Sequence, residues 1–278
     1  MNNTDSPHAF LDQDFKNNLL LGAQHTEVQL NEYIKQALSR RSYRQFKQEA
    51  LPPAVLQSLA EVARWTASST GQQRFSIIRL TDPLLKEKIA QFCRQDYLAQ
   101  APEWWIFIAD CRRNALIAET KDAHLQHAAS MDKFFQAFTD ACLAAQHVAS
   151  AAESLGLGTV FTGSIHNNDK ELIKLLNLPK HCFPALGLSF GWPNQEPLQK
   201  PRIPQALRFF ENSYDLNLSD NSALLKAYDE QMQDYYDLRD PNRRLESFSL
   251  QAKNSVEGFD PVREQILKSI FSQGFTEI

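Results

Sequence analysis

Three of the chain's nine glycines fall within one short stretch, Leu155-Gly156-Leu157-Gly158-Thr159-Val160-Phe161-Thr162-Gly163. The alanine-rich residues before it, from about 130 to 155, predict a long helix, whereas residues 159–162 predict a strand. A dinucleotide-binding fingerprint needs the opposite order, in which a strand is followed by glycines and then by the helix that meets the pyrophosphate. The order found here therefore excludes a Rossmann turn.

The three glycines receive two different interpretations. Gly156 and Gly158 are interpreted as helix-stop residues, because glycine tolerates the left-handed backbone that often ends a helix. Gly163 follows a strand that reads as buried, where a missing side chain lets the backbone approach a flat ligand closely. The alanines of the preceding helix recur on successive turns, which predicts a central core helix and a candidate subunit interface.

Working outward from this stretch, the pattern of apolar residues predicts the other elements. Strands are expected at 75–80, 104–109 and 183–192, and helices at 28–38, 52–65, 83–92, 168–176 and 222–239. The run at 104–109 is six successive apolar residues, which is typical of a strand buried on both faces. Together these elements predict a mixed α+β architecture of four or five short strands with helices on both sides.

Composition excludes several classes of protein. With 43% hydrophobic and 22% charged residues, the chain is neither disordered nor a disulfide scaffold. A net charge of −4 argues against a general nucleic-acid binder. The four cysteines form no C-x-x-C pair, so a zinc site or redox dithiol is not expected, and their scarcity suits a reducing cytoplasm. Without an evident signal peptide or membrane-length apolar run, a cytoplasmic protein is predicted.

Basic residues gather in three places in this acidic chain. Arg40, Arg41 and Arg44 surround Ser42, Lys200 and Arg202 flank a proline, and Arg239, Arg243 and Arg244 form the third group. Guanidinium groups and a hydroxyl that converge on one point suit a phosphate. A solvated basic helix end is the alternative for each group, and the residues alone leave both interpretations open.

No constellation of catalytic side chains stands out. The sequence has no P-loop, no G-x-S-x-G elbow and no H-E-x-x-H motif. His124 and His127 have the spacing to share a helix face, but no third metal ligand is identifiable nearby. Phosphate-type clusters without an evident acid, base or nucleophile indicate that a cofactor performs the chemistry.

Three motifs of the sequence together resemble those of the nitroreductase-like FMN flavoproteins. The motifs are Arg41-Ser42-x-Arg44-x-Phe46, then residues 151–158 followed by Phe161-Thr162-Gly163, then Leu188-x-x-Gly191-Trp192-Pro193 with Lys200-Pro201-Arg202. The likeness is closest to the NADPH-dependent oxygen-insensitive nitroreductase and flavin reductase group. It extends through residues 211–214, 228–231 and 242–244, and so covers roughly residues 28–250 in the right order.

The resemblance implies a fold and an assembly. The fold is a nitroreductase-like α+β fold, with a central, mostly antiparallel sheet flanked by helices. Residues 1–25 form an N-terminal extension, 26–205 the FMN-binding core, and 206–278 a C-terminal arm that embraces the partner subunit and contacts the nucleotide. The implied assembly is a homodimer with FMN at the subunit interface, and no nucleic acid, membrane or metal takes part.

The resemblance also assigns site residues by position. For the FMN phosphate and ribityl end they are Arg40, Arg41, Ser42, Lys200 and Arg202; for the polar pyrimidine edge, Arg44, Ser68 and Gln95; for the isoalloxazine, Phe161, Thr162, Gly163 and Ser164; and for the NADPH 2′-phosphate, Arg239 and Arg243. Ser164 replaces a usual second glycine, and Gly71 stands where relatives carry an aromatic residue. No catalytic protein residue is expected, because the flavin performs the chemistry.

The implied activity is that of an FMN-dependent NAD(P)H oxidoreductase that reduces nitroaromatics, quinones or free flavins by a ping-pong mechanism. One alternative is a flavin-binding storage or transfer protein with little turnover. Another is an interaction protein without flavin, in which the alanine-rich helix and the basic clusters bind a partner. Bleaching of bound flavin by NADPH separates the first interpretation from both alternatives.

Overall fold

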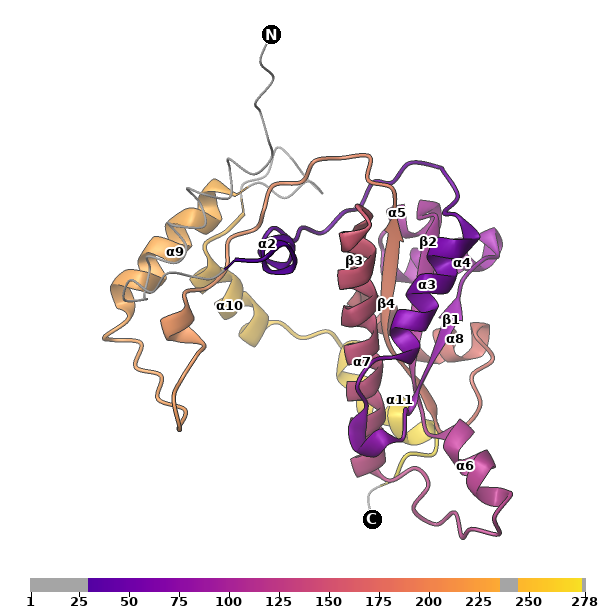
Figure 1. The fold of residues 1–278 in the computed structure, drawn as a ribbon. Coiled ribbons are helices and arrows are strands. Elements are labelled where there is room, and N and C mark those ends of the chain that lie inside the picture. Colours follow the sequence, from indigo (N-terminus) through magenta and orange to yellow (C-terminus); the bar gives the residue numbers. More distant parts are fainter. Residues whose placement is uncertain (1–29, 236–244, 277–278) are drawn as a thin grey trace. The chain divides into compact units, whose positions relative to one another are not determined.

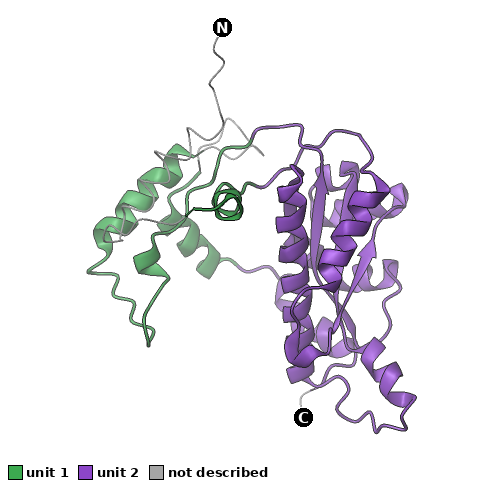
Figure 2. Cartoon of the chain, in the orientation of Figure 1, with its two compact units in different colours: residues 1–41, 197–258 green, residues 42–196, 259–278 purple. Residues whose placement is uncertain are grey.

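The computed structural model describes residues 30–235 and 245–276, which form two compact units (Figures 1 and 2). Unit 1 contains the residues up to 41 and residues 197–258, and unit 2 contains residues 42–196 and the residues from 259 onward. Unit 2 holds the sheet and the helices α3 (Pro53–Arg64), α4 (Pro83–Cys93), α5 (Tyr97–Gln100), α6 (Arg112–Glu119), α7 (Met131–Ser154), α8 (Asp169–Leu175) and α11 (Ile266–Ser272). Its short 3₁₀ turns are η1 (Ser69–Gly71), η2 (Gly163–Asn168) and η4 (Arg263–Gln265).

The sheet of unit 2 has four strands in the order β1-β2-β4-β3, and every neighbouring pair is antiparallel. The strands are β1 (Phe75–Arg79), β2 (Glu103–Asp110), β3 (Gly158–Thr162) and β4 (Cys182–Gly191). Helices cover both faces (Figure 1). The expected α+β fold with an antiparallel sheet is confirmed, and so are the three strands predicted around residues 75, 104 and 183.

Strand β2 is buried along its whole length. Trp105 and Phe107 pack into the core that the sheet shares with α3 and α7, whereas Trp104 and Ile106 pack into the opposite core against α4 and α5. Successive side chains of a strand point to opposite faces, so a strand covered on both sides needs a continuous apolar run. The structure confirms the prediction of a doubly buried strand at this run.

Helix α7 is the central helix of unit 2. Its N-cap, Ser130, accepts a hydrogen bond from the Lys133 amide over 3.5 Å. Small side chains cover its buried face, which packs on β2, β4 and α3: Ala137, Ala141, Ala144, Ala145, Ala149 and Ala152. Such side chains let the helix axis lie close to the sheet. The prediction of a core helix is confirmed.

The two glycines between α7 and β3 have different roles. Gly156 has a φ of +79°, as expected for a left-handed helix stop. The same prediction for Gly158 is wrong, because Gly158 lies within β3 and has no positive φ. A Cβ atom on Gly158 would lie 2.6 Å from Cγ of Tyr43. Gly158 is therefore required by the ring that packs on it and not by its backbone conformation.

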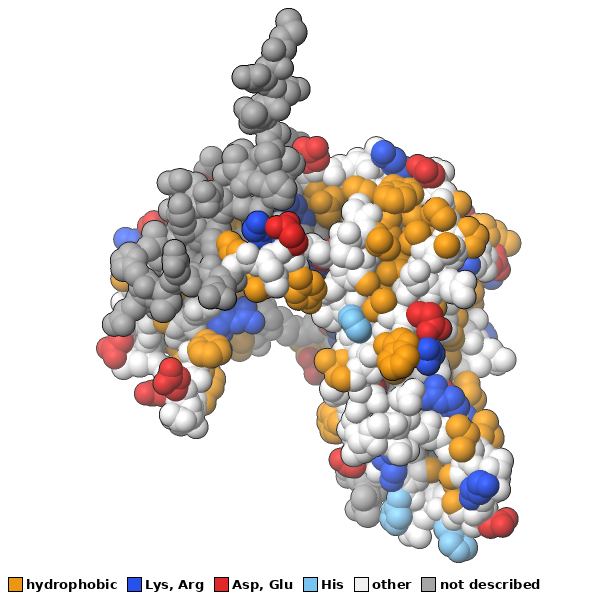
Figure 3. Space-filling model, viewed as in Figure 1, with side chains coloured by type: hydrophobic (Ala, Val, Ile, Leu, Met, Phe, Trp, Pro, Cys, Tyr) orange, Lys and Arg blue, Asp and Glu red, His pale blue; other side chains and the backbone are white. Residues whose placement is uncertain are grey.

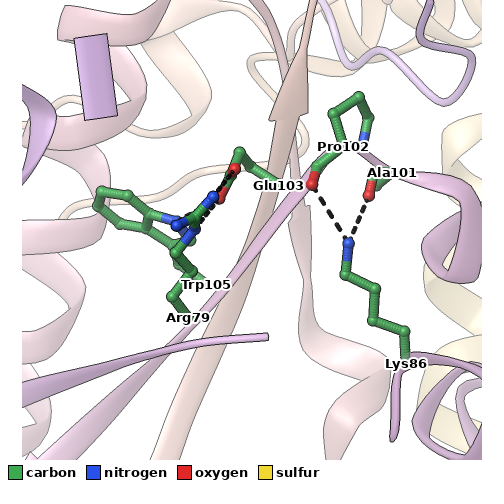
Figure 4. Close-up of polar contacts among 6 residues, drawn as sticks. All are labelled: Arg79, Lys86, Ala101, Pro102, Glu103 and Trp105. Carbon is green, nitrogen blue, oxygen red and sulfur yellow. Dashed lines mark hydrogen bonds and ion pairs between the residues drawn. The ribbon is translucent and has the colours of Figure 1, made fainter. Parts of the chain in front are cut away.

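A buried carboxylate marks one end of the sheet (Figure 4). Glu103 accepts hydrogen bonds from the Arg79 guanidinium at 2.7 and 2.5 Å and from the Trp105 indole at 3.0 Å. The Lys86 ammonium, also buried, donates to the carbonyl oxygens of the two residues before Glu103 at 2.8 and 3.2 Å. Burial lowers the pKa of Lys86, and the charge of Glu103 partly opposes that effect.

The C-terminal segment returns to unit 2 and is anchored there. Thr276 forms a parallel bridge with Ser130, and the side chain of Phe275 is buried. The Gln273 amide donates to the carbonyl oxygens of Pro179 at 2.9 Å and of Cys182 at 2.8 Å. These contacts fix α11 and the turn η4 that precedes it.

Unit 1 consists of α2 (Glu32–Leu38), the turn η3 (Gln205–Leu207), α9 (Ser222–Asp234) and α10 (Phe248–Glu257). The rings of Tyr228 and Phe248 pack 5.2 Å apart and join α9 to α10. The helices predicted at 28–38 and 222–239 correspond to α2 and α9. Residues 30, 31 and 235 are described but lie outside these helices, and the rest of each prediction lies outside the described residues.

Two further findings concern elements that were not predicted or were predicted differently. Residues 120–130 form turns and irregular backbone between α6 and α7, so His124 and His127 do not lie on a helix although their spacing would allow them to share a helix face. Within residues 30–235 and 245–276, no three potential metal-ligating side chains cluster. Nor is any helix in that part of the chain both long and apolar enough to span a membrane.

Candidate functional site

The site predicted at residues 161–164 lies where β3 passes into η2. β3 is an outer strand of the sheet, paired with β4 along one edge. Its other edge receives Ser42, which forms a parallel bridge with Thr159, and the Tyr43 amide donates to the Thr159 carbonyl over 2.9 Å. Ser42, predicted from the first motif, is thus placed beside the strand of the second motif.

Gly163 presents an open backbone at the end of β3. A Cβ atom built on it would meet no atom within 4 Å, and its φ is not positive. The glycine is therefore required neither by a left-handed conformation nor by packing within the described chain. An open backbone of this kind admits the close approach of a flat group.

The residues around Gly163 differ in what they present. Phe161 is half-buried and packs toward the core beneath α7. Thr162 is buried as a whole residue within the sheet, and its Oγ1 has no hydrogen-bond partner among the described residues. The Ser164 Oγ is buried without a hydrogen-bond partner among the described residues, and burial raises the pKa of the Cys93 thiol to about 11.

His166, which the sequence analysis did not single out, holds the turn η2 that begins at Gly163. His166 is buried; its Nδ1 lies 2.7 Å from Oδ1 of Asp169 and its Nε2 lies 2.9 Å from the Ala185 carbonyl oxygen. Because a carbonyl oxygen only accepts, Nε2 carries a proton in this arrangement. The side chain of His166 thereby ties η2 to β4 and to the start of α8.

From the C-terminal segment, Arg263 reaches the same turn. Its guanidinium donates to the Gly163 carbonyl oxygen over 2.8 Å. Asp260 accepts the backbone amides of Val262 at 2.9 Å and Arg263 at 3.2 Å, and these hydrogen bonds lower the pKa of the Asp260 carboxyl. The contact of Arg263 with residue 163 has no local signal in the sequence.

Arg44 and Tyr97 line the same pocket, and Tyr97 hydrogen-bonds Gln95. Arg44 lines a pocket of about 470 Å³ together with Phe46, Gln100 and Tyr97. The Tyr97 hydroxyl donates to Gln95 Oε1 over 2.6 Å. Tyr97 thus borders the pocket of Arg44 and bonds Gln95, and Arg44 and Gln95 are two of the three residues predicted for the polar edge of the flavin.

Ser68, the third residue of that group, belongs to a separate loop of unit 2, residues 66–74. Its Oγ accepts the Gln73 amide over 3.2 Å, which leaves the hydroxyl hydrogen to donate elsewhere. Gly71 in the same loop has a φ of +68° and open space around it.

The basic residues predicted for a phosphate gather in unit 1. The Gln199 side-chain amide donates to the Leu38 carbonyl oxygen, which places the segment before Lys200 beside the end of α2. Arg40 and Arg41 follow that end directly. Arg202 donates to the Lys200 carbonyl oxygen over 2.8 Å. Arg239 and Arg243, predicted for NADPH, lie outside the described residues.

Comparison with known protein families gives the same assignment as the motifs. Residues 37–192 match the nitroreductase family, and residues 200–277 match the nitroreductase family C-terminal domain. The chain belongs to the nitroreductase family. The resemblance inferred from the three motifs is thereby confirmed.

Individual nitroreductase relatives match over most of their length. The oxygen-insensitive NADPH nitroreductase of Salmonella typhimurium is 37% identical over 243 residues, which are 87% of this chain and 97% of that protein. The FMN reductase (NADPH) of Bacillus subtilis is 32% identical over 227 residues, covering 81% and 91%. Among solved structures, NfrA2 of B. megaterium superposes with a TM-score of 0.82 at 32% identity. The superposition covers 90% of this chain and 100% of the NfrA2 chain.

Proposed function

We propose that this chain is an FMN-dependent NAD(P)H oxidoreductase that reduces nitroaromatics, quinones or free flavins. The observation that carries the proposal is the open backbone of Gly163 at the end of β3, in a chain that belongs to the nitroreductase family. The names of the relatives support it, since they include an NADPH nitroreductase and an FMN reductase.

The residues of the chain fit FMN. A ring system needs a flat surface without side chains, and Gly163 offers one where a Cβ would enter free space. Lys200, Arg202, Arg40 and Arg41 together supply the cationic donors that a phosphate requires. Arg44 and Gln95 are side chains that hydrogen-bond the oxygen and nitrogen atoms of a pyrimidine edge.

The protein binds and orients, and it supplies no nucleophile. When bound, FMN would supply the hydride-transfer chemistry between NADPH and the acceptor. The guanidinium of Arg44 would stabilise the negative charge that collects at the polar edge on reduction. The buried thiol of Cys93, whose pKa of about 11 keeps it protonated, takes no part.

Both substrates are proposed to use the same face in turn. The open space at Gly163 would admit the flavin ring together with a nicotinamide or a flat aromatic acceptor stacked against that ring. One surface that serves donor and acceptor alternately gives ping-pong kinetics. Such a site relies on stacking rather than on directed hydrogen bonds, so it would accept chemically diverse acceptors.

A homodimer is the proposed assembly, with the arm that embraces the partner drawn from residues 206–278 before the segment from 259 onward that packs in unit 2 of its own chain. Phe135 and Leu143 lie eight residues apart on α7 and are 63% and 46% exposed, and Trp65 at the end of α3 is 73% exposed. Hydrophobic side chains gather over α3 and α7 in the view of Figure 3. An exposed apolar face of this kind marks an interaction surface. The four free thiols support a cytoplasmic location.

The decisive experiment is a visible spectrum of the purified chain followed by anaerobic addition of NADPH. The expected result is a yellow protein whose flavin band bleaches with NADPH and returns when a nitroaromatic or quinone is added. A protein that binds FMN but stays oxidised would support flavin storage or transfer instead. A colourless protein that FMN cannot reconstitute would overturn the proposal.

The choice of nucleotide is tested separately. Arg239 and Arg243 are proposed to bind the NADPH 2′-phosphate. Arg239→Ala should raise KM for NADPH about 10- to 150-fold, equivalent to roughly 1.5–3 kcal/mol for a charged hydrogen bond. KM for NADH should change far less. Equal effects on the two nucleotides would refute the phosphate role.

A further inference from the structure

Asp140 lies on α7 and is fully buried. Its Oδ1 accepts the backbone amide of Ser69 over 2.7 Å, and its Oδ2 accepts the backbone amide of Arg74 over 3.0 Å. One carboxylate thus binds the loop of residues 66–74 at two points that are five residues apart, one oxygen to each.

The loop between these two points has an unfavourable backbone. Thr70 and Gln73 have φ values of +50° and +51°, a left-handed conformation that non-glycine residues adopt at a cost of about 1 kcal/mol or more each. Hydrogen bonds to a carboxylate are about twice as strong as neutral ones. The two bonds to Asp140 therefore hold a loop conformation that the local sequence disfavours.

Two further side chains of α7 contact the loop near its ends. Gln136 accepts from the Arg74 guanidinium over 2.6 Å, and His147 lies 3.0 Å from the Thr66 hydroxyl. Gln136 is partly exposed and His147 is exposed, so water competes for both contacts. Of these three α7 residues, Asp140 alone binds the loop out of reach of water.

We propose that Asp140 is a positioning residue of the flavin site: it fixes the 66–74 loop so that the Ser68 hydroxyl meets the polar edge of FMN. This role rests on the proposed function. The geometry requires a carboxylate, because both of its oxygens accept from an N–H group. An asparagine would turn its own amide N–H groups toward one of the two backbone donors.

The test compares Asp140→Asn with Glu103→Gln. Glu103 is also a buried carboxylate of unit 2, and its hydrogen bonds go to Arg79 and Trp105, which lie outside the loop. The measurements are amide hydrogen exchange at Ser69 and Arg74 in the chain as isolated, the dissociation constant for FMN, and kcat and KM with NADPH and a quinone.

Asp140→Asn should speed exchange at Ser69 and Arg74 at least about tenfold and weaken FMN binding at least about tenfold. Glu103→Gln should lower Tm without either change. Unchanged exchange, or faster exchange with normal FMN affinity and kinetics, would overturn the role of Asp140 alone. A wild-type chain that takes up no FMN would overturn the proposed function and this role with it.

A second pair of variants avoids the core. Gln73→Val places a β-branched residue at a φ of +51°, and Gln73→Gly removes the same side chain while relaxing the backbone. The valine variant should reproduce the faster exchange and the weaker FMN binding of Asp140→Asn, and the glycine variant should bind FMN as the wild type does. Equal FMN affinity in both variants would contradict the positioning role even if Asp140→Asn does not fold.

Discussion

Arg263 and Gly163 stand 100 residues apart in the chain, yet the Arg263 guanidinium donates to the Gly163 carbonyl oxygen over 2.8 Å. The contact joins the C-terminal segment to the turn that follows β3. α11 and Phe275, which follow Arg263 in the chain, anchor this segment in unit 2. The open backbone at Gly163 is therefore oriented partly by a residue outside its own motif.

Arg263→Ala should weaken FMN binding about three- to tenfold, the effect of losing one hydrogen bond worth about 0.5–1.5 kcal/mol. The Gly163 carbonyl would then be free to rotate away from its position. Fluorescence titration with FMN measures the change. Lys268→Ala, which removes an exposed cation from α11, is the control and should leave the affinity unchanged; a similar loss in both variants would indicate an effect of net charge.

Gly163→Ala and Gly158→Ala should have opposite consequences. A Cβ at 163 meets no atom within 4 Å, so folding stability should change by less than about 0.5 kcal/mol, while FMN affinity falls at least about tenfold. A Cβ at 158 would lie 2.6 Å from the Tyr43 ring, so that variant should lose about 1–3 kcal/mol. Urea unfolding and FMN titration of both proteins provide the check. Normal FMN affinity in Gly163→Ala would show that the backbone at Gly163 is not the flat surface that binds the flavin ring.

Much of the fold was predictable from local patterns. The run at 104–109 is apolar at every position, and this property follows directly from burial on both faces of the sheet. Helix α7 was predictable because its alanines recur with the helical period. Gly158 was misinterpreted because the partner that requires it, Tyr43, is distant in sequence and no local pattern marks the contact.

The site was predictable only where its residues belong to motifs. Ser42 and Gly163 belong to two of them, and the structure places Ser42 beside β3 and Gly163 directly after the end of β3. Arg263 and His166 act through contacts made by the tertiary fold, so local spacing does not reveal them. Asp140 did carry a signal, since a carboxylate among the buried alanines of α7 needs partners that only another segment can supply.

Alkaline pH should destabilise the protein through its buried thiols. Burial raises the pKa of Cys93 and Cys111 to about 11 and that of Cys182 to about 12, from an ordinary 9.0. Below pH 9 each thiol is protonated in both the folded and the unfolded state, so its contribution to folding stability is fully present. Above pH 9 only the unfolded thiols ionise, and stability falls by up to about 1.4 kcal/mol per thiol and pH unit until the folded pKa is passed.

Urea unfolding at pH 8, 9 and 10 measures this loss, and Cys93→Ala is the comparison. Its stability should fall less steeply between pH 9 and 10 than that of the wild type, because one ionising thiol is missing from the unfolded state. Lysines and tyrosines titrate equally in both proteins and cancel in the difference. Parallel pH profiles would show that Cys93 does not carry the raised pKa.

Removing Arg79 alone should destabilise the protein more than removing Arg79 and neutralising Glu103 in the same variant. Arg79→Met leaves the buried Glu103 carboxylate with only the Trp105 indole and the nearby charge of Lys86. The free energy of unfolding should fall by about 3 kcal/mol. This value is at the lower end for breaking a buried ion pair, because Arg79 is half-exposed. The double variant Arg79→Met, Glu103→Gln replaces the stranded charge with a neutral amide and should recover at least about 1 kcal/mol. Urea unfolding of the two single variants and the double variant completes a mutant cycle. A double variant less stable than Arg79→Met would mean that Lys86, rather than Arg79, is the cation that balances Glu103.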